Sequence, residues 1–162
     1  MESVEDIEQV RELIGRKPLK ILAKLQNCVA LHNLTEIIEK SDGIMLERWS
    51  LSLNFSPAYL VFVQDYIINK CKLIGRPVII ASPIIESMSK KPIPTPSEAV
   101  DITVAITQGI DAFVLSTVTA QCESYIDSLK ALRNICFAAE TNLDPYKDFY
   151  NLEEYNWLPR FL

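Results

Sequence analysis

The chain has 162 residues, of which 49% are hydrophobic and 23% are charged, a composition typical of a folded domain and unlike a disordered segment. Its 16 basic and 21 acidic residues give a net charge of −5, which argues against nucleic-acid binding because phosphate contacts require a clustered basic face. No apolar run approaches the roughly 20 residues of a membrane-spanning helix, and the acidic N-terminus has no signal-peptide hydrophobic region. We therefore expect a cytoplasmic protein that binds neither nucleic acid nor membranes.

Apolar periodicity and turn residues predict that helices alternate with short strands along most of the chain. The predicted elements are, in chain order, a helix over Ser3–Ile14, a strand over Leu19–Lys24, a helix over Leu31–Lys40, a strand over Ile44–Leu46, a helix over Pro57–Leu73, a strand over Val78–Ala81, a helix between Ser97 and Gly109, a strand over Ala112–Leu115 and a helix over Ser124–Glu140. The segments 47–56 and 82–96 are predicted to be irregular loops, and Ser97 is predicted to cap the helix after the second loop.

Buried strands that alternate with helices at intervals of about 30 residues indicate an α/β fold with a parallel sheet. In such folds the carboxyl ends of the strands form one rim, where chemistry is usually located. Lys24, Glu47, Ser82 and Ser116 stand at or just after the predicted strand ends. We therefore expect these four side chains on the same rim.

Four strands are too few to close a barrel, and an open sheet of this size leaves two exposed edges. Residues 1–140 are therefore expected to form a half-sized barrel that pairs with another segment or is itself a fragment. Residues 141–162 are aromatic and acidic and are interpreted as a tail or linker that packs on a partner or on an exposed sheet edge.

Lys24 lies where the apolar run of the first strand gives way to Gln26 and Asn27. Burying an unpaired ammonium group in the core is too costly, so the lysine is expected to project into a polar mouth. On spacing alone, the alternative is a lysine that extends to solvent from a strand end.

Four motifs agree in order and spacing with those of one enzyme family. They are Lys20–Asn27, Ser41–Met45, Gly75–Ile79 with Glu86–Met88, and Pro94–Asp101. Together they resemble pyruvate kinase, from residue 3 to about residue 140. The likeness is to the second half of that family's (β/α)8 barrel, which implies a partial TIM barrel of about four parallel strands with flanking helices. The family's first barrel half, inserted lid domain and carboxyl-terminal regulatory domain have no counterpart in this sequence.

The resemblance implies a role for each of five rim residues. In the family, the lysine that matches Lys24 stabilises charge on the transferring phosphoryl group. The positions of Gln26 and Ser50 normally hold a glutamate and an aspartate that bind the divalent metal. Ser82 stands where the family has a threonine near the substrate, and Ser116 matches a serine of a Leu-Ser-Gly-Glu-Thr motif. The family implies Mg2+ and K+ as cofactors, and phosphoenolpyruvate and ADP as the substrates of a glycolytic reaction.

The loop around Ser50 departs most from the family pattern. The family's Arg-Gly-Asp-Leu-Gly reads Arg48-Trp49-Ser50-Leu51-Ser52 in this chain, and its first three residues are the expected substrate-binding positions. Hard divalent cations need carboxylate oxygens, so the amide of Gln26 and the hydroxyl of Ser50 are expected to bind metal poorly. Glu47 is a candidate replacement ligand, and the alternative is a glutamate that is solvated or paired with an arginine.

For the other rim residues, a purely structural role is an alternative to a role in binding or catalysis. Ser82 and Ser116 have no histidine base nearby in the sequence, so ordinary loop hydroxyls are favoured over nucleophiles. Trp49 is expected either to form a binding surface or to plug a mouth that no longer takes substrate. Lys24 and Arg48 keep their positive charge, so a small anion-binding module is a third possibility.

The sequence thus predicts a pyruvate-kinase-like half-barrel with impaired catalysis that acts as an interaction or structural paralogue. Its expected assembly is a homo-oligomer or hetero-oligomer, for instance with a complete pyruvate kinase subunit. The alternative is a fragment of a pyruvate kinase, or an active one, that transfers phosphate from phosphoenolpyruvate to ADP with Mg2+ and K+.

Overall fold

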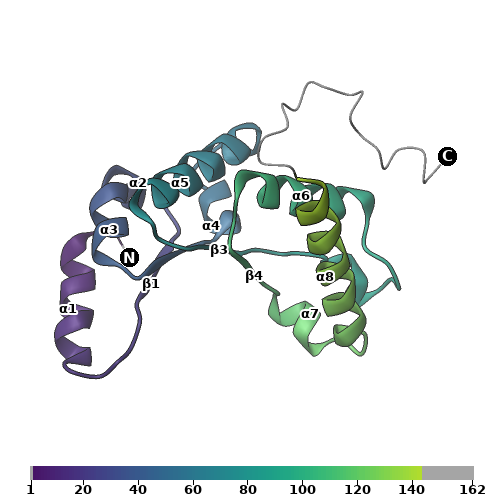
Figure 1. Ribbon diagram of the computed structural model, residues 1–162, viewed down its shortest axis with the longest axis horizontal. Coiled ribbons are helices and arrows are strands. Elements are labelled where there is room, and N and C mark those ends of the chain that lie inside the picture. The colour runs from purple at the N-terminus through teal and green to yellow at the C-terminus, as the bar shows by residue number, and fades with distance from the viewer. Residues whose placement is uncertain (1, 144–162) are drawn as a thin grey trace.

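Helices and short strands alternate along the described part of the chain, residues 2–143 of a computed structural model (Figure 1). The elements are α1 (Val4–Ile14), β1 (Leu22–Leu25), α2 (Cys28–His32), α3 (Leu34–Lys40), β2 (Gly43–Leu46), α4 (Arg48–Ser52), η1 (Pro57–Tyr59), α5 (Leu60–Ile74), β3 (Val78–Ala81), η2 (Glu86–Ser89), α6 (Pro96–Gln108), β4 (Ala112–Val114), α7 (Thr117–Gln121) and α8 (Tyr125–Asn142). The strands form one parallel sheet in the order β1-β2-β3-β4. The predicted α/β fold with four parallel strands and flanking helices is confirmed.

The first strand starts later than predicted, at Leu22 rather than Leu19. In the parallel register Leu22 pairs with Gly43, the first residue of β2, so the residues before it have no strand to pair with. Leu19 is 55% exposed and belongs to the connection from α1. The aliphatic composition of this segment predicted the strand correctly, but its start depends on the neighbouring strand.

Two helix predictions were wrong in detail. The helix predicted over Leu31–Lys40 is two helices, α2 and α3, and Asn27 caps the first by accepting a hydrogen bond from the Ala30 N–H at 3.0 Å. The cap of α6 is Thr95 rather than Ser97, because Pro96 already occupies the first helical turn.

Short helices occur in loops that were predicted to be irregular. α4 lies within the segment 47–56, and the short helix η2 lies within the segment 82–96. α7 lies between β4 and α8, where no element was predicted. The last helix continues to Asn142, past the predicted end at Glu140. Residues 144–162 lie outside the described part of the chain, so the division into a half-barrel and a tail stays a prediction.

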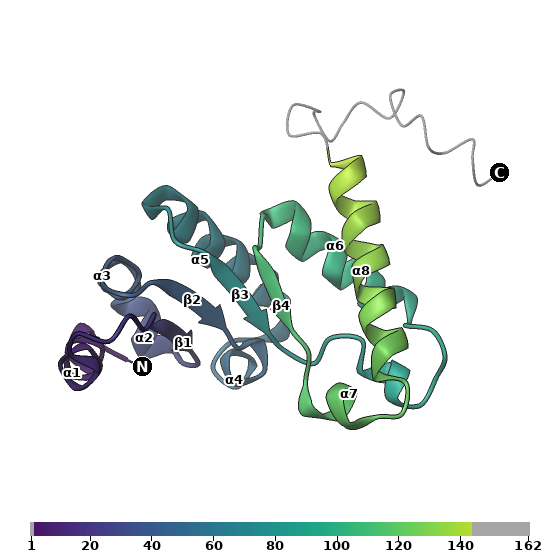
Figure 2. The same cartoon turned by 60° about the horizontal axis from the view of Figure 1, so that its bottom comes forward.

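Within residues 2–143, helices cover one face of the sheet, as the turned view in Figure 2 shows for α5 and α6. Side chains of a strand alternate between its two faces. The helix-facing set is almost fully buried: Ala23, Leu25, Ile44, Leu46, Val78 and Ile80 are each at most 1% exposed. On the opposite face, Leu22 and Val114 are each 42% exposed. The core therefore lies between the sheet and α3, α5 and α6.

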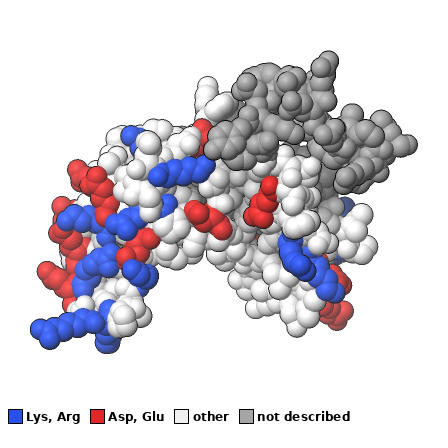
Figure 3. Space-filling view, in the orientation of Figure 1, with Lys and Arg blue, Asp and Glu red and all other residues white. Residues whose placement is uncertain are grey.

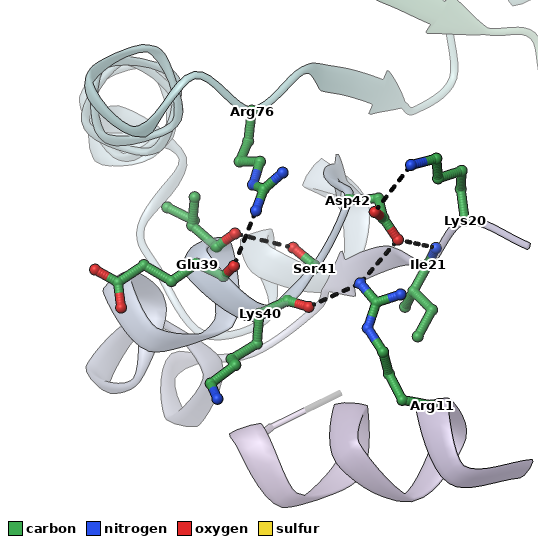
Figure 4. Close-up of polar contacts among 9 residues, drawn as sticks. Arg11, Lys20, Ile21, Glu39, Lys40, Ser41, Asp42 and Arg76 are labelled. Atoms are coloured by element: carbon green, nitrogen blue, oxygen red, sulfur yellow. Dashed lines mark hydrogen bonds and ion pairs between the residues drawn. The ribbon is translucent and has the colours of Figure 1, made fainter. Parts of the chain in front are cut away.

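A polar cluster fixes the amino ends of the strands (Figure 4). The Asp42 carboxylate accepts hydrogen bonds from the Ile21 N–H at 2.8 Å and from Arg11 at 2.9 Å, and these contacts hold its pKa below the usual range. Arg76 donates to the carbonyl oxygen of Glu39 at 3.1 Å, near the end of α3. Cations at a helix carboxyl end complement its dipole. This cluster ties α1 and α3 to the base of the sheet.

The loop that leads from β3 to α6 is held by Glu98. Its carboxylate accepts hydrogen bonds from the N–H and hydroxyl of Ser87 at 3.0 and 2.5 Å and from the N–H and hydroxyl of Thr95, both at 2.7 Å. Burial raises the pKa of Glu98, but the bonds from Ser87 and then from Thr95 outweigh it and lower the pKa to about 2. One carboxylate thus joins η2 to the first turn of α6.

We predict that Glu98→Gln destabilises the fold in a pH-dependent way. The pKa of Glu98 is lower in the folded chain, about 2 against 4.5, so its ionised form stabilises the fold above the unfolded value. That contribution, roughly 1–2 kcal/mol after solvent screening, is lost as pH falls from about 4.5 to about 2. Urea denaturation at pH 7 and at pH 2.5 should show a large difference between the two proteins only at pH 7. An equal difference at both values would contradict the role of the charge.

Candidate functional site

A cleft of about 410 Å3 opens at the carboxyl ends of the strands, and Lys24, Glu47, Ser82 and Ser116 are all among the residues that line it. The structure therefore brings together the four residues that the sequence placed on one rim. Gln26 and the three residues Arg48–Ser50 are not part of the lining.

Lys24 and Glu47 form the charged centre of this cleft. The Lys24 Nζ lies 3.8 Å from a carboxylate oxygen of Glu47, and the two side chains are 43% and 16% exposed. Lys24 thus projects into a polar mouth, as expected. Because Glu47 faces the same cleft, its negative charge offsets the positive charge of Lys24 there.

Glu47 is also the N-cap of α4. Its carboxylate accepts a hydrogen bond from the Ser50 N–H at 3.4 Å and a very short one from the Ser50 hydroxyl. Burial raises the pKa of Glu47, but the bonds from Ser50, a further bond from Gln26 and the charge of Lys24 outweigh it, so the pKa lies below the ordinary value. This glutamate is ionised at neutral pH and its oxygens already have partners.

These residues fit a divalent cation poorly. Gln26 offers a neutral amide, and the Ser50 hydroxyl donates a hydrogen bond to the Glu47 carboxylate. Glu47 is therefore the only carboxylate among the expected ligands, whereas Mg2+ relies on oxygen ligands that carry charge. Within residues 2–143, no three histidine, cysteine, aspartate or glutamate side chains are grouped so that they could hold a metal ion.

Arg48 directs its guanidinium away from the cleft. It forms a bidentate ion pair with Asp101 of α6, in which Nη1 and Nη2 lie 2.6 and 2.7 Å from the two carboxylate oxygens. The two residues are 53 positions apart in the sequence. Its Nε donates to the Ser82 hydroxyl at 3.1 Å, and its Nη1 lies 3.4 Å from the side-chain oxygen of Gln64. Planar arginine–carboxylate pairs of this kind are strong and directional. The guanidinium thus fixes α4 against α6 and the end of β3.

Two residues of this network had no role in the sequence prediction. Asp101 ends one of the family motifs, but nothing in its spacing indicated Arg48 as its partner. Gln64 is 3% exposed and lies on the same face of α5 as the buried residues Ile67, Ile68 and Cys71. A polar residue at a core position of a predicted helix signals a buried hydrogen-bond network, and that signal was present in the sequence.

The two rim serines and the tryptophan have local structural surroundings. The Ser82 hydroxyl accepts hydrogen bonds from the N–H of Arg48 at 3.2 Å as well as from its guanidinium. The Ser116 hydroxyl caps α7 by accepting from the Thr119 N–H at 3.4 Å. The Trp49 side chain is 65% exposed, so it does not plug the cleft.

Comparison with known proteins identifies the family. The model of the pyruvate kinase barrel domain matches residues 1–129. The chain belongs to the pyruvate kinase family. It is 35% identical over 146 residues to pyruvate kinase of Eimeria tenella, which covers 89% of this chain and 28% of the relative. It is 36% identical over 138 residues to pyruvate kinase of Dictyostelium discoideum, covering 84% of this chain and 27% of the relative.

Solved pyruvate kinase structures share the arrangement described above. The structure of Cryptosporidium parvum pyruvate kinase in complex with ADP superposes with a TM-score of 0.85 at 30% sequence identity, covering 89% of this chain and 31% of that chain. The four-stranded sheet therefore corresponds to part of the barrel in that pyruvate kinase structure. The chain spans less than a third of the length of the curated relatives described above.

The surface of this pyruvate kinase relative carries mixed charge. On the face shown in Figure 3, acidic and basic side chains alternate over α1 and α3, and neither sign forms an extended field there. Across residues 2–143, none of the helices combines the length and apolar character that crossing a bilayer requires.

We predict that Asp101→Asn weakens the fold through Arg48. The Arg48 side chain is only 18% exposed, so it loses a charged partner where water replaces it poorly, at a cost of about 1–2 kcal/mol. Urea denaturation measures this loss. The matched control is Glu8→Gln, which breaks the Lys40–Glu8 pair at 3.4 Å with both side chains 56% exposed, and which should cost less than about 0.5 kcal/mol. Equal effects of the two variants would contradict a special role for Arg48.

Proposed function

We propose that this chain is a pyruvate-kinase-like half-barrel with impaired phosphotransfer, which acts as an interaction or structural paralogue. The observation that supports the proposal is which side chains occupy the expected metal-ligand positions at the carboxyl ends of the strands. Gln26 and Ser50 stand at the positions where the family has metal-binding carboxylates. The remaining carboxylate, Glu47, is engaged by Lys24 and by the first turn of α4.

The chemistry explains why this rim is a poor catalyst. Phosphoryl transfer depends mainly on positioning and on the neutralisation of developing charge, which a bound metal ion supplies. Replacing two carboxylates by an amide and a hydroxyl removes two formal negative charges that attract the cation. Lys24 keeps its charge, but Glu47 lies close to it and competes with any incoming phosphate. The chain is therefore left with a lysine and two serines at a site that needs a metal.

The proposed role follows from this loss. We infer that the chain works through association, in a homo-oligomer or with another pyruvate kinase polypeptide such as a complete subunit, and that it does so in the cytoplasm. Mg2+, K+, phosphoenolpyruvate and ADP would be its ligands only if the site were active.

A second reading, a fragment of an active pyruvate kinase, is favoured by one observation. The chain covers only 27% and 28% of two relatives, so most of an intact enzyme lies outside the matched region. In that reading Glu47 would have to replace the missing metal carboxylates. The two readings differ in whether the rim binds a divalent cation.

We predict that the chain does not bind Mn2+ measurably, whereas the double variant Gln26→Glu/Ser50→Asp does. Two restored carboxylates add charged oxygen ligands, and we expect at least about a tenfold gain in affinity. Isothermal titration calorimetry with millimolar Mn2+ measures this for the wild type, the double variant and Glu47→Ala. Saturable binding by the wild type that Glu47→Ala abolishes would show that Glu47 rescues the site and would overturn the proposal.

We also predict that the purified chain forms no pyruvate from phosphoenolpyruvate and ADP with Mg2+ and K+. The assay couples pyruvate to a spectroscopic readout and runs beside Lys24→Ala as the blank for contaminating enzyme. Turnover that is above background in the wild type and absent from Lys24→Ala would contradict impaired catalysis. Equal traces for both proteins agree with the proposal.

A further inference from the structure

A second cavity, of about 430 Å3, lies between two loops outside the rim. Residues 88–92, around the end of η2, form one wall, and residues 121–124, between the end of α7 and the start of α8, form the other. None of these residues lines the rim cleft. A ligand of this cavity would therefore bind at a site separate from Lys24 and Glu47.

Two consecutive lysines, Lys90 and Lys91, line the first wall. Neither forms an ion pair with a carboxylate of residues 2–143, whereas Lys24, Lys40 and Lys130 each have such a partner. Two neighbouring ammonium groups repel each other, and an anion held between them offsets that repulsion because both attract it. This wall therefore favours a ligand with a doubly charged anionic group.

The backbone that carries the two lysines is fixed by contacts within the chain. The N–H groups of Lys90 and Lys91 both donate to the Ser87 carbonyl oxygen, at 3.0 and 2.9 Å. The Glu98 carboxylate holds Ser87 in turn by accepting a hydrogen bond from its N–H at 3.0 Å. The ring of Pro92 restricts the backbone directly after Lys91. Binding would therefore order only the lysine side chains, which keeps the entropic cost of binding low.

The two walls of the cavity are joined to each other. The Ser124 hydroxyl donates to the Met88 carbonyl oxygen at 2.7 Å, although the two residues are 36 positions apart. On the second wall, the Cys122 thiol donates to the Thr119 carbonyl oxygen at 3.0 Å. These bonds hold the loop between α7 and α8 against the turn that carries the lysines. The shape of the cavity is thus set by the fold.

The second wall carries the opposite charge. Glu123 lines the same cavity, but none of the ion pairs within residues 2–143 joins it to Lys90 or Lys91. The cavity thus has positive charge on one wall and negative charge on the other. A second anionic group on the ligand would lie near Glu123 and be repelled. The part of the ligand that faces this wall must therefore be neutral or positively charged.

We propose that this cavity binds a small phosphate monoester, with its phosphate at Lys90 and Lys91 and a neutral or positively charged remainder toward Glu123. A phosphate monoester carries nearly two negative charges at neutral pH, and lysine binds phosphate as a point charge. The volume of about 430 Å3 is typical of small-molecule sites and leaves room for an organic group beside Met88 and Pro92. Because the rim takes no part, this site is independent of whether phosphotransfer is impaired.

The test compares two monoesters of similar size, O-phosphoethanolamine and phosphoglycolate, whose remainders carry an amine and a carboxylate. In isothermal titration calorimetry with the full 162-residue chain, O-phosphoethanolamine should bind saturably and at least about fivefold more tightly than phosphoglycolate. Glu123→Gln should remove most of that difference. Lys90→Gln/Lys91→Gln should weaken the binding of O-phosphoethanolamine at least about tenfold.

A phosphate diester distinguishes a soluble monoester from a lipid head group. Glycerophosphoethanolamine has the head-group chemistry of a phospholipid and carries one negative charge fewer, so it should bind at least about fivefold more weakly than O-phosphoethanolamine. Equal or tighter binding of the diester would overturn the proposed ligand class.

The matched control is Arg16→Gln/Lys17→Gln, which removes the same charge from another exposed consecutive pair that does not line the cavity. This variant and Lys24→Gln should both bind like the wild type. A loss as large in the control pair would indicate unspecific charge attraction, and a loss in Lys24→Gln would place the ligand at the rim. Either result overturns the proposal, as does the absence of saturable binding up to about 20 mM.

Nuclear magnetic resonance of the wild-type chain gives a readout that needs no variant. On titration with O-phosphoethanolamine, the largest changes in amide chemical shift should occur within residues 88–91 and 121–124. Changes centred on any other part of the chain would place the ligand elsewhere and overturn the proposal.

Discussion

The structure depends on burying one face of a short parallel sheet against helices. The strands have only three or four residues each, so their helix-facing side chains must supply most of the apolar contact that holds the layers together. This constraint explains why Ala23, Ile44 and Ile80, which face the helices, are completely buried. Their chain neighbours Lys24, Met45 and Ile79 face the other side of the sheet and are only partly buried. The opposite face has exposed apolar side chains at its edges, Leu22 and Val114, and no layer formed by residues 2–143 packs on it.

Two charged residues of the rim, Glu47 and Arg48, have structural roles. Glu47 follows β2 directly and serves both as an ion-pair partner of Lys24 and as the cap of α4. Arg48, the next residue, holds the same short helix to α6 through Asp101. Both residues hold the loop in place through contacts within the chain. These contacts fix the short helix against the sheet and α6.

The sequence predicted the strands and the rim because both follow from local patterns. Aliphatic runs bounded by turn residues identify buried strands, and the residues after them share the rim in any parallel sheet. Features decided by distant residues were missed. The start of β1 depends on where β2 begins, and the helix α4 depends on a pair between Arg48 and Asp101 that spans 53 positions. The prediction of Ser97 as the cap of α6 was wrong because it did not place Pro96 in the first helical turn, which makes Thr95 the cap.

Strand β2 separates two polar centres with different tasks. Asp42, just before the strand, anchors α1 and the strand β1 through Arg11 and Ile21, whereas Glu47 faces the cleft just after it. Because the anchor lies at the end remote from the rim, substitutions among the rim residues leave its contacts untouched. The contacts that hold the fold and the side chains that line the cleft are thus located at opposite ends of β2, so each set can be altered without the other.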